Sequence, residues 1–454
     1  MVRKFILPIV EEITNEIIFD LYQKHQTEAS RIRKMKRYYK NQNDIMNREY
    51  EDPNKPANKL AHNYAAYITN SYTGYFMGNP VTYKSENQAL LDQLNDIFMY
   101  NDEADENTSV ATEQSICGYA YEIVYMDEEA QVRFKTVPTE EMVVVYDNTL
   151  EERIQFAFRY YNVYDLDDDN KKELVLYTKD SIKTYDFTDD KLILKEEQQI
   201  FFGDVPVADY ENNNNRIGDF ENVITLIDAY DKANSDTAND FEYFTNALLV
   251  VLGVVMSDDE AGPLDFKNNR VLNFADTTSK AEYLLKDIND TALENYKNRL
   301  NADIHKFSNV VDMTDENFSG NLSGIALKYK FSGMENVTGI KEAKFKKGLM
   351  KRLELIIAVT NIKLNSLFTY TEIKPVFTRN LPTNESELVT MAKSLYGIVS
   401  EDTVLSLLPF IEDVQAEKEA IAKEKEESAL SLVDYQFNNE DNKDDPVGED
   451  DGEQ

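Results

Sequence analysis

Cysteine and histidine are scarce in this chain of 454 residues, and tryptophan is absent. The single cysteine, Cys117, excludes a disulfide within the chain and a metal cage built from several thiolates. The three histidines, His25, His62 and His305, lie far apart and do not form the H-E-x-x-H pattern of zinc enzymes. No segment reaches the roughly 18–20 apolar residues that a membrane-spanning helix needs, and no signal peptide is visible. We therefore expect a soluble, reduced, intracellular protein with no membrane partner.

The charge of the chain is strongly one-sided. Asp and Glu number 84 against 48 Lys and Arg, which gives a formal net charge of −36 at pH 7. This balance disfavours nucleic acids and anionic membranes as partners, because affinity for phosphate comes mainly from Lys and Arg. A hydrophobic content of 42% with 11% aromatic residues is typical of a folded protein. The length allows two to four domains, each large enough to bury a core.

One segment departs from this acidic background. Eight basic residues and only two acids, Glu335 and Glu342, lie between positions 328 and 352. The basic residues are Lys328, Lys330, Lys341, Lys344, Lys346, Lys347, Lys351 and Arg352. A loop rich in Gly, Ser, Asp and Asn precedes them at 312–324. Such a patch can bind a polyanion, pair with acids of a neighbouring subunit or solvate the outer face of a helix.

Catalytic motifs are missing. The chain has no P-loop, no G-x-G-x-x-G after a strand and no G-x-S-x-G elbow. Acid clusters at 165–169, 189–190 and 258–260 fall in predicted turns and lack the EF-hand spacing, so we interpret them as solvated turns. We expect Cys117 to be a small buried hydrophobe and His305 to be a packed neutral imidazole. We assign no catalytic, cofactor-binding or metal-binding residue, and we expect no cofactor.

The hydrophobic periodicity predicts an α+β fold that is mainly α. In the first half it predicts two helices within 8–50 and a further helix over 60–72. A strand at 81–83 and a polar helical region at 84–117 follow. From 118 the period changes to two, which predicts the successive strands of an antiparallel sheet region. These strands are expected at 119–125, 131–137, 142–146, 154–160 and 173–177, with the meander continuing over 180–202.

In the second half, Asp219 is a predicted N-cap, and the longest helical pattern of the chain follows it up to Gly253. A compact insert at 257–286 contains a short strand at 270–274, and a second helix follows from about 289 to 308. The basic segment continues as an apolar helix to Phe368. The remaining elements are expected at 373–377 (strand), 384–396, 400–408 and 413–432 (helices), with a disordered acidic tail from 434.

Several short motifs follow one another along the chain. They are Arg37–Tyr39, Asn58–Tyr64, Thr73–Tyr83, Gly203–Val207, Ile217–Tyr230, Ser235–Tyr243 and Gly397–Val404. Together with the order of the elements they resemble the portal proteins of tailed bacteriophages, particularly the type found in phages of Gram-positive hosts. The resemblance covers the chain apart from its acidic tail. No single motif is diagnostic, but their order and spacing are specific.

The resemblance implies a ring, usually of twelve subunits, at one vertex of the capsid. Double-stranded DNA would be packaged through its channel by the terminase large subunit and later ejected. The other implied partners are a head-completion adaptor protein and the major capsid and scaffolding proteins. The implied location is the virion, and the host cytoplasm during assembly.

Carried onto this chain, the resemblance implies named domains. They are a wing at 1–219 with the strand 373–377, stem helices at 220–256 and 289–311, a clip at 257–288, a tunnel loop at 312–323, a long helix at 324–369, a crown at 383–432 and a disordered tail at 433–454. The residues expected to face DNA in the channel are Asn317, Phe318, Ser319, Gly320, Asn321, Ser323, Lys328 and Lys330. Lys341, Lys344, Lys346, Lys347, Lys351 and Arg352 are candidates for contact with either DNA or a neighbouring subunit. Two alternatives stay open: an acid-rich, metal-dependent nuclease or hydrolase, and a monomeric head-assembly adaptor.

Overall fold

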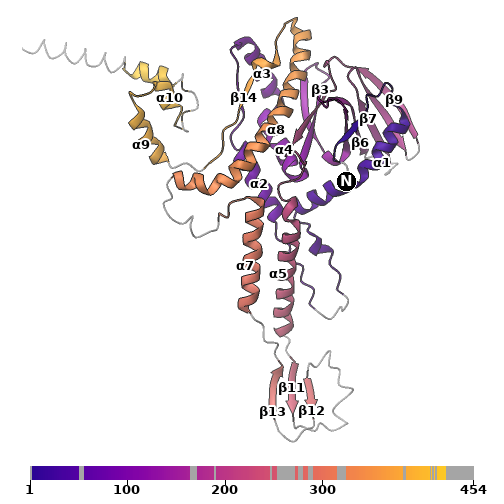
Figure 1. The fold of residues 1–454 in the computed structure, drawn as a ribbon, viewed down its shortest axis with the longest axis vertical. Coiled ribbons are helices and arrows are strands. Elements are labelled where there is room, and N and C mark those ends of the chain that lie inside the picture. The colour runs from indigo at the N-terminus through magenta and orange to yellow at the C-terminus, as the bar shows by residue number, and fades with distance from the viewer. Residues whose placement is uncertain are drawn as a thin grey trace, which may run out of the picture. The chain divides into compact units, whose positions relative to one another are not determined.

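The computed structural model describes residues 3–50, 56–163, 171–188, 191–245, 248–252, 271–274, 280–284, 290–313, 324–381, 385–408, 411, 414 and 417–425. The chain divides into two compact units, one of residues 1–318 and 330–380 and the other of residues 319–329 and 381–454. The fold is α+β and mainly helical, as the periodicity predicts (Figure 1). Within the described ranges, no helix is both long enough and apolar enough to cross a membrane.

The first helix is longer than the sequence pattern predicts. Helix α1 spans Asn15–Tyr39 without a break, where we expected two helices. The Thr14 side chain caps it by accepting a hydrogen bond from the Ile17 amide. The buried stripe continues from Ile18 through Ala29 to Met35, with basic residues between its members and no Gly or Pro to end the helix. The change from an apolar to a basic composition is therefore a change of exposed face within one helix.

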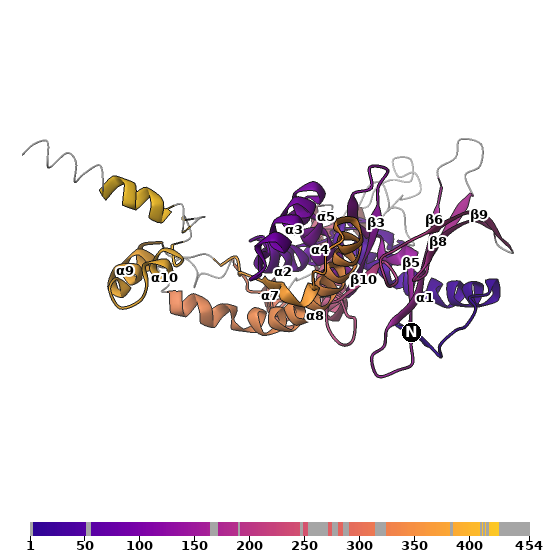
Figure 2. The same cartoon turned by 90° about the horizontal axis from the view of Figure 1, so that it is seen from above.

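Helix α1 packs on a six-stranded sheet. The strands are β1 (Phe5–Leu7), β5 (Met142–Asp147), β6 (Ile154–Asn162), β7 (Lys172–Tyr177), β8 (Ser181–Thr188) and β9 (Lys191–Gln199), hydrogen-bonded in the order β1-β5-β6-β7-β8-β9. Strand β1 is parallel to β5, and the remaining pairs are antiparallel. Ile18 and Leu21 of α1 share a buried core with Phe158 of the sheet, and Figure 2 shows α1 beside the sheet.

A second, three-stranded sheet interrupts the predicted meander. It contains β3 (Tyr119–Met126), β4 (Val132–Val137) and β10 (Val207–Glu211) in the order β10-β3-β4. All the predicted strands from 119 to 177 form, but β4 does not pair with β5. Pro138 and a 3-10 turn at Thr139–Glu141 separate them and send the chain to the other sheet. Period-two patterning identifies strands, but it does not say which strands are neighbours.

Three helices surround the second sheet. They are α2 (Tyr64–Met77), α3 (Gln88–Asn101) and α4 (Glu103–Cys117). Cys117, the last residue of α4, is fully buried as predicted. The short strand β2 (Thr82–Lys84) pairs antiparallel with β14 (Lys374–Val376), which is the strand predicted at 373–377.

The long helical pattern after Asp219 ends earlier than predicted. A 3-10 turn at Glu221–Val223 leads into α5 (Ile224–Thr245), and Leu248–Leu252 is strand β11 rather than helix. Strand β11 pairs with β12 (Val271–Phe274) and β13 (Lys280–Leu284). The prediction of a helix to 256 was wrong because a short, wholly apolar run fits a buried strand as well as a helix. The remainder of the predicted clip, at 257–270, 275–279 and 285–288, lies outside the described residues.

Two further helices follow, one in the first unit and one that begins in the second unit and continues into the first. Helix α7 (Asp290–Ser308) lies side by side with α5 (Figure 1). The 41-residue α8 (Gly324–Leu364) joins the basic segment and the apolar pattern after it in one helix. Its apolar part, from Leu353 to Val359, shares a core with α3 and with β3 and β4.

The described part of the second unit contains α9 (Glu385–Leu395) and α10 (Glu401–Leu405). The predicted cap of α10 is confirmed, because the Ser400 side chain accepts a hydrogen bond from the Thr403 amide. Residues 417–425 are helical, in agreement with the predicted charged helix. The acidic tail at 433–454 lies outside the described residues.

The buried His25 makes stability depend on pH. Its Nδ1 lies 2.8 Å from the Tyr160 hydroxyl, and burial lowers its pKa to about 4 from an ordinary value of 6.5. Between pH 6.5 and pH 4, His25 is protonated in the unfolded chain but stays neutral in the folded chain. The free energy of unfolding should therefore fall by up to about 3 kcal/mol as the pH drops through this range. Urea unfolding of wild type and of His25→Gln across this range tests the prediction. The variant should show a shallower pH dependence, and equal slopes would contradict the role of His25.

Candidate functional site

Helix α8 carries all eight basic residues that the sequence singles out. Lys328 is exposed and Lys330 is partly buried. The six loop residues expected in a channel, Asn317, Phe318, Ser319, Gly320, Asn321 and Ser323, lie outside the described residues, so their positions stay a prediction. The six basic residues from 341 to 352 can be placed individually, and they differ sharply in burial.

The inner face of α8 approaches strand β10 closely. Phe345 packs against Tyr210, with ring centroids 4.9 Å apart. One turn along, Gly348 has no side chain, and a Cβ built there would lie 2.5 Å from Cδ1 of Tyr210 and 2.8 Å from the Asp209 carbonyl oxygen. Glycine is therefore required at this crossing, because the helix backbone lies against a strand backbone. The crossing brings the cations on either side of Gly348 over the acids of β10 and β3.

Lys341 is buried and paired within the chain. Its ammonium contacts the Asp219 carboxylate, and both side chains are almost fully buried. Asp219 also accepts hydrogen bonds from the Ser115 hydroxyl at 2.5 Å and from the Asn212 amide at 2.8 Å. The Lys341 ammonium lies 4.8 Å from the centroid of the Tyr72 ring. Asp219 is thus a buried counter-ion for α8 rather than the predicted N-cap of α5.

Arg352 makes the most deeply buried ion pair on α8. Its Nε and one terminal nitrogen donate to the two oxygens of Glu122 at 2.7 and 2.6 Å, and neither side chain is exposed. The other terminal nitrogen donates to the Asn107 side-chain oxygen at 2.7 Å. Burial raises the pKa of the Glu122 carboxyl, while the Arg352 guanidinium opposes that shift. A bidentate pair of this kind fixes both the position and the rotation of the helix.

Lys344 and Lys351 make shallower ion pairs on the same helix. Lys344 lies 2.8 Å from Glu211, and Lys351 lies 2.5 Å from Asp204. Burial alone would raise the pKa of Glu211, but Lys344 and Arg216 hold it below its ordinary value. A polar cavity of about 180 Å³ lies here, lined by five cations and five acids together with Tyr146 and Ile154. The charged lining residues are Lys4, Arg153, Lys344, Lys347, Lys351, Glu151, Glu152, Asp204, Asp209 and Glu211.

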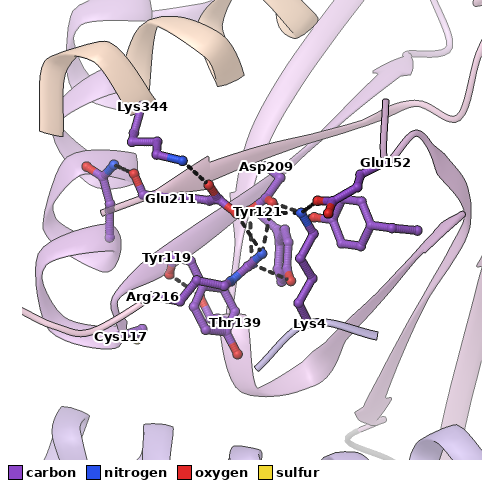
Figure 3. Close-up of polar contacts among 12 residues, drawn as sticks. Lys4, Cys117, Tyr119, Tyr121, Thr139, Glu152, Asp209, Glu211, Arg216 and Lys344 are labelled. Atoms are coloured by element: carbon purple, nitrogen blue, oxygen red, sulfur yellow. Dashed lines mark hydrogen bonds and ion pairs between the residues drawn. The ribbon is translucent and has the colours of Figure 1, made fainter. Parts of the chain in front are cut away.

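Arg216 stands at the centre of the adjoining polar cluster (Figure 3). Its guanidinium donates to both oxygens of Asp209, at 3.1 and 3.0 Å, and to the Tyr121 hydroxyl at 2.8 Å. The guanidinium carbon lies 4.0 Å from the centroid of the Tyr119 ring. Our sequence analysis did not single out Arg216 or Glu122. Glu122 left a usable signal, because an acid within an otherwise apolar strand predicts a buried cation as its partner.

The structure therefore separates the six basic residues into two groups. In the first group, each residue forms an ion pair with a carboxylate of its own chain. This group consists of Lys341, Lys344, Lys351 and Arg352. Lys346 and Lys347 are exposed and contact no carboxylate among the described residues. Contact with DNA or a neighbouring subunit stays a prediction for all six residues. Lys346 and Lys347 are the two whose side chains are exposed, and the first group also anchors α8 within its own chain.

The ion pairs of this site hold helix α8 in position. In the ranges that the structure describes, no group of three or more His, Cys, Asp and Glu side chains could hold a metal ion. His305 is largely buried, with its ring edge-on to Tyr67 and its Nδ1 3.3 Å from the Val310 carbonyl oxygen. This agrees with the predicted packed imidazole.

Two of the motifs quoted above contact each other. The segment 58–62 lies along α5 and is held by polar residues spaced four apart on that helix. The Asn58 amide donates to Asn239 at 2.7 Å, the Leu60 amide to Ser235 at 2.9 Å, and the His62 amide to Asp231 at 2.8 Å. The Asn58–Tyr64 and Ser235–Tyr243 motifs, distant in the sequence, are therefore in contact, and segment 58–62 with its hydrogen-bond acceptors on α5 is called the strap below.

Comparisons with known proteins agree with this fold. The family model described as phage portal protein, SPP1 Gp6-like, matches residues 18–430. The chain is 25% identical over 452 residues to the portal protein of Bacillus phage SPP1, which covers 92% of this chain and 88% of that protein. It is 24% identical over 444 residues to the portal protein of Clostridium phage phiCD119, covering 90% and 95%. The match includes the strap, the α8 anchors and most of the second unit, and the chain therefore belongs to the SPP1 Gp6-like family of phage portal proteins.

Proposed function

We propose that the chain forms a ring of about twelve copies at one vertex of the capsid, and that double-stranded DNA enters and leaves the head through the channel of this ring. The observation that carries the proposal is the family match over 18–430. Portal proteins are structural components of the virion rather than enzymes, and we propose the same for this chain. Before the capsid is complete, the ring would assemble in the host cytoplasm.

The domain assignment follows the expected boundaries, with revisions at the clip and at the long helix. Pairing of β14 with β2 supports placing 373–377 with the wing at 1–219. The side-by-side packing of α5 and α7 supports their assignment as stem helices. We propose that the clip begins at Leu248, because β11 pairs with β12 and β13. The long helix ends at Leu364 rather than at 369, because α8 ends there. The tunnel loop at 312–323, the crown at 383–432 and the acidic tail keep their expected boundaries.

The charge of the ring suits a channel that must let DNA slide. Twelve chains of net charge −36 would carry about −430 formal charges, so the wall would repel phosphate rather than bind it tightly. Weak contacts that re-form at each step would come from the tunnel loop and from the cations nearest to it, Lys328 and Lys330. Anchoring of α8 by Lys341 and Arg352 would keep the base of that loop in place while DNA moves.

We propose four protein partners besides the neighbouring copies. The terminase large subunit would dock on the clip during packaging, and a head-completion adaptor protein would replace it there afterwards. The major capsid and scaffolding proteins would surround the ring at its vertex. These assignments rest on membership of the family.

The test is a negative-stain image of the purified protein together with its mass from light scattering. We expect toroids with a central hole and a particle of about 630 kDa, roughly twelve times 52.4 kDa. A monomer of 52.4 kDa in every salt condition would instead support a monomeric adaptor. Metal-dependent cleavage of DNA by the purified protein would support a nuclease.

A further inference from the structure

Two exposed apolar patches lie at the two ends of the strand order in the six-stranded sheet. The first, the β1-edge patch, consists of Ile6, Ile9 and Leu150, which are 46%, 69% and 104% exposed. Leu150 lies in the turn between β5 and β6. The Gln155 amide holds segment 7–10 against this hairpin by bonding the Leu7 carbonyl and the Val10 amide. The patch is therefore one surface built from two segments.

The second patch is a groove where the chain leaves β9. It has a volume of about 290 Å³ and is lined largely by apolar side chains of the β3 end, the segment 200–202 and the end of α8. Phe201 and Ile362 in this lining are 70% and 65% exposed. An isolated exposed apolar residue is ordinary, but a hollow lined by several is typical of a binding surface.

The two patches differ in charge as well as in shape. Lys363 lines the groove and, among the residues that the structure describes, donates only to neutral oxygens, the Ala130 carbonyl at 3.3 Å and the Gln131 side chain at 3.2 Å. The β1-edge patch is flanked by the exposed carboxylates of Glu11 and Glu12, whereas Glu151 beside Leu150 is paired with Arg153. An exposed apolar patch bordered by two carboxylates that are free among the described residues thus matches an apolar groove with a cation in its lining.

The sheet keeps these surfaces apart within one chain. Strands β1 and β9 are separated by four strands, about 24 Å at 4.8 Å per strand. Figure 2 shows β5 and β9 well apart in this sheet. A closed ring needs two different complementary patches on each subunit, one for each neighbour. We infer that the β1-edge patch of one copy docks into the groove of the next, an inference that rests on the ring proposed above.

Cysteine cross-linking tests this contact. The variant Leu150→Cys with Ile362→Cys should give, on mild oxidation, a ladder of covalent multimers that a reductant removes. The native Cys117 is fully buried and contributes no background. The matched control is Leu150→Cys with Ile340→Cys, because Ile340 is also exposed on α8 but lies about 33 Å away along the helix. It should stay monomeric on a non-reducing gel.

A second variant measures the strength of the contact. Ile362→Asp should raise the chain concentration at which rings form by roughly tenfold or more, since it removes an apolar contact and places an acid facing acids. Ile340→Asp should leave that concentration unchanged. Rings of the expected mass that give no ladder and tolerate Ile362→Asp would overturn this inference alone. A wild-type chain that never forms rings would overturn the proposed function and the inference with it.

Discussion

Replacing Arg352 by Met should lower the free energy of unfolding by about 3–5 kcal/mol, because it leaves the Glu122 carboxylate buried without its counter-ion. Glu122 is fully buried, and the Tyr210 hydroxyl at 3.1 Å would be its only remaining side-chain partner among the described residues. Met fills a similar volume, so most of the loss in the free energy of unfolding should come from the unpaired Glu122 carboxylate rather than from a cavity. Urea unfolding at a fixed chain concentration, followed by circular dichroism, measures the change.

Two further variants separate charge from packing. Lys351→Met, one residue earlier, removes two partly exposed ion pairs, with Asp204 and Glu354, and should cost less than about 1 kcal/mol. The double variant Arg352→Met with Glu122→Gln should be more stable than Arg352→Met alone, since Gln carries no charge and can still bond Tyr210. A loss below 1 kcal/mol for Arg352→Met would show that this pair does not anchor α8.

Gly348→Ala should destabilise the protein by about 1–3 kcal/mol, although alanine is the better helix former. The added methyl would lie 2.5 Å from Cδ1 of Tyr210 and 2.8 Å from the Asp209 carbonyl oxygen. The carbonyl belongs to the backbone of β10 and cannot rotate away, so α8 would have to move off the sheet. The same displacement would lengthen the Lys344–Glu211 pair nearby. We expect a lower melting temperature and weaker ring formation.

The matched control is Gly339→Ala in the same helix. A Cβ there would meet no atom within 4 Å, so this variant should be stabilised by about 0.5–1 kcal/mol through the gain in helix propensity. Opposite signs at two glycines nine residues apart would show that the close crossing, and not helix propensity, sets the effect. If Gly348→Ala proved as stable as Gly339→Ala, α8 would not lie against β10 as described.

The anchors connect stability to the proposed role. Helix α8 is tied at Lys341, Lys344 and Arg352 to acids that come from three other segments of the chain. A force applied to its N-terminal end would therefore be transmitted to the second sheet and its helices. In the proposed channel, moving DNA would be the source of that force.

Much of the secondary structure follows from local patterns. The structure contains each strand predicted between Tyr119 and Tyr177, of which 131–137 alternates in hydrophobicity and 142–146 is a short apolar run rich in Val. The Ser400 cap was readable because a hydroxyl before a helical pattern has a specific backbone donor to bond. Failures arose where a pattern fits two structures. Leu248–Leu252 is short and wholly apolar, and its strand state comes from pairing with β12 and β13, which are distant in sequence.

Family, charge balance and most elements were readable from residue order alone, because composition, periodicity and motif spacing are properties of neighbouring residues. The contacts of the individual basic residues between 328 and 352 could not be read in this way. Lys341 and Lys346 look alike in sequence, yet one is buried on Asp219 and the other is exposed. Only the crossing of α8 over β10 separates them, since it brings acids at positions 122, 211 and 219 to one face of the helix. The role of a lysine depends on which carboxylate lies within ion-pairing distance of its ammonium group, and tertiary packing determines that distance.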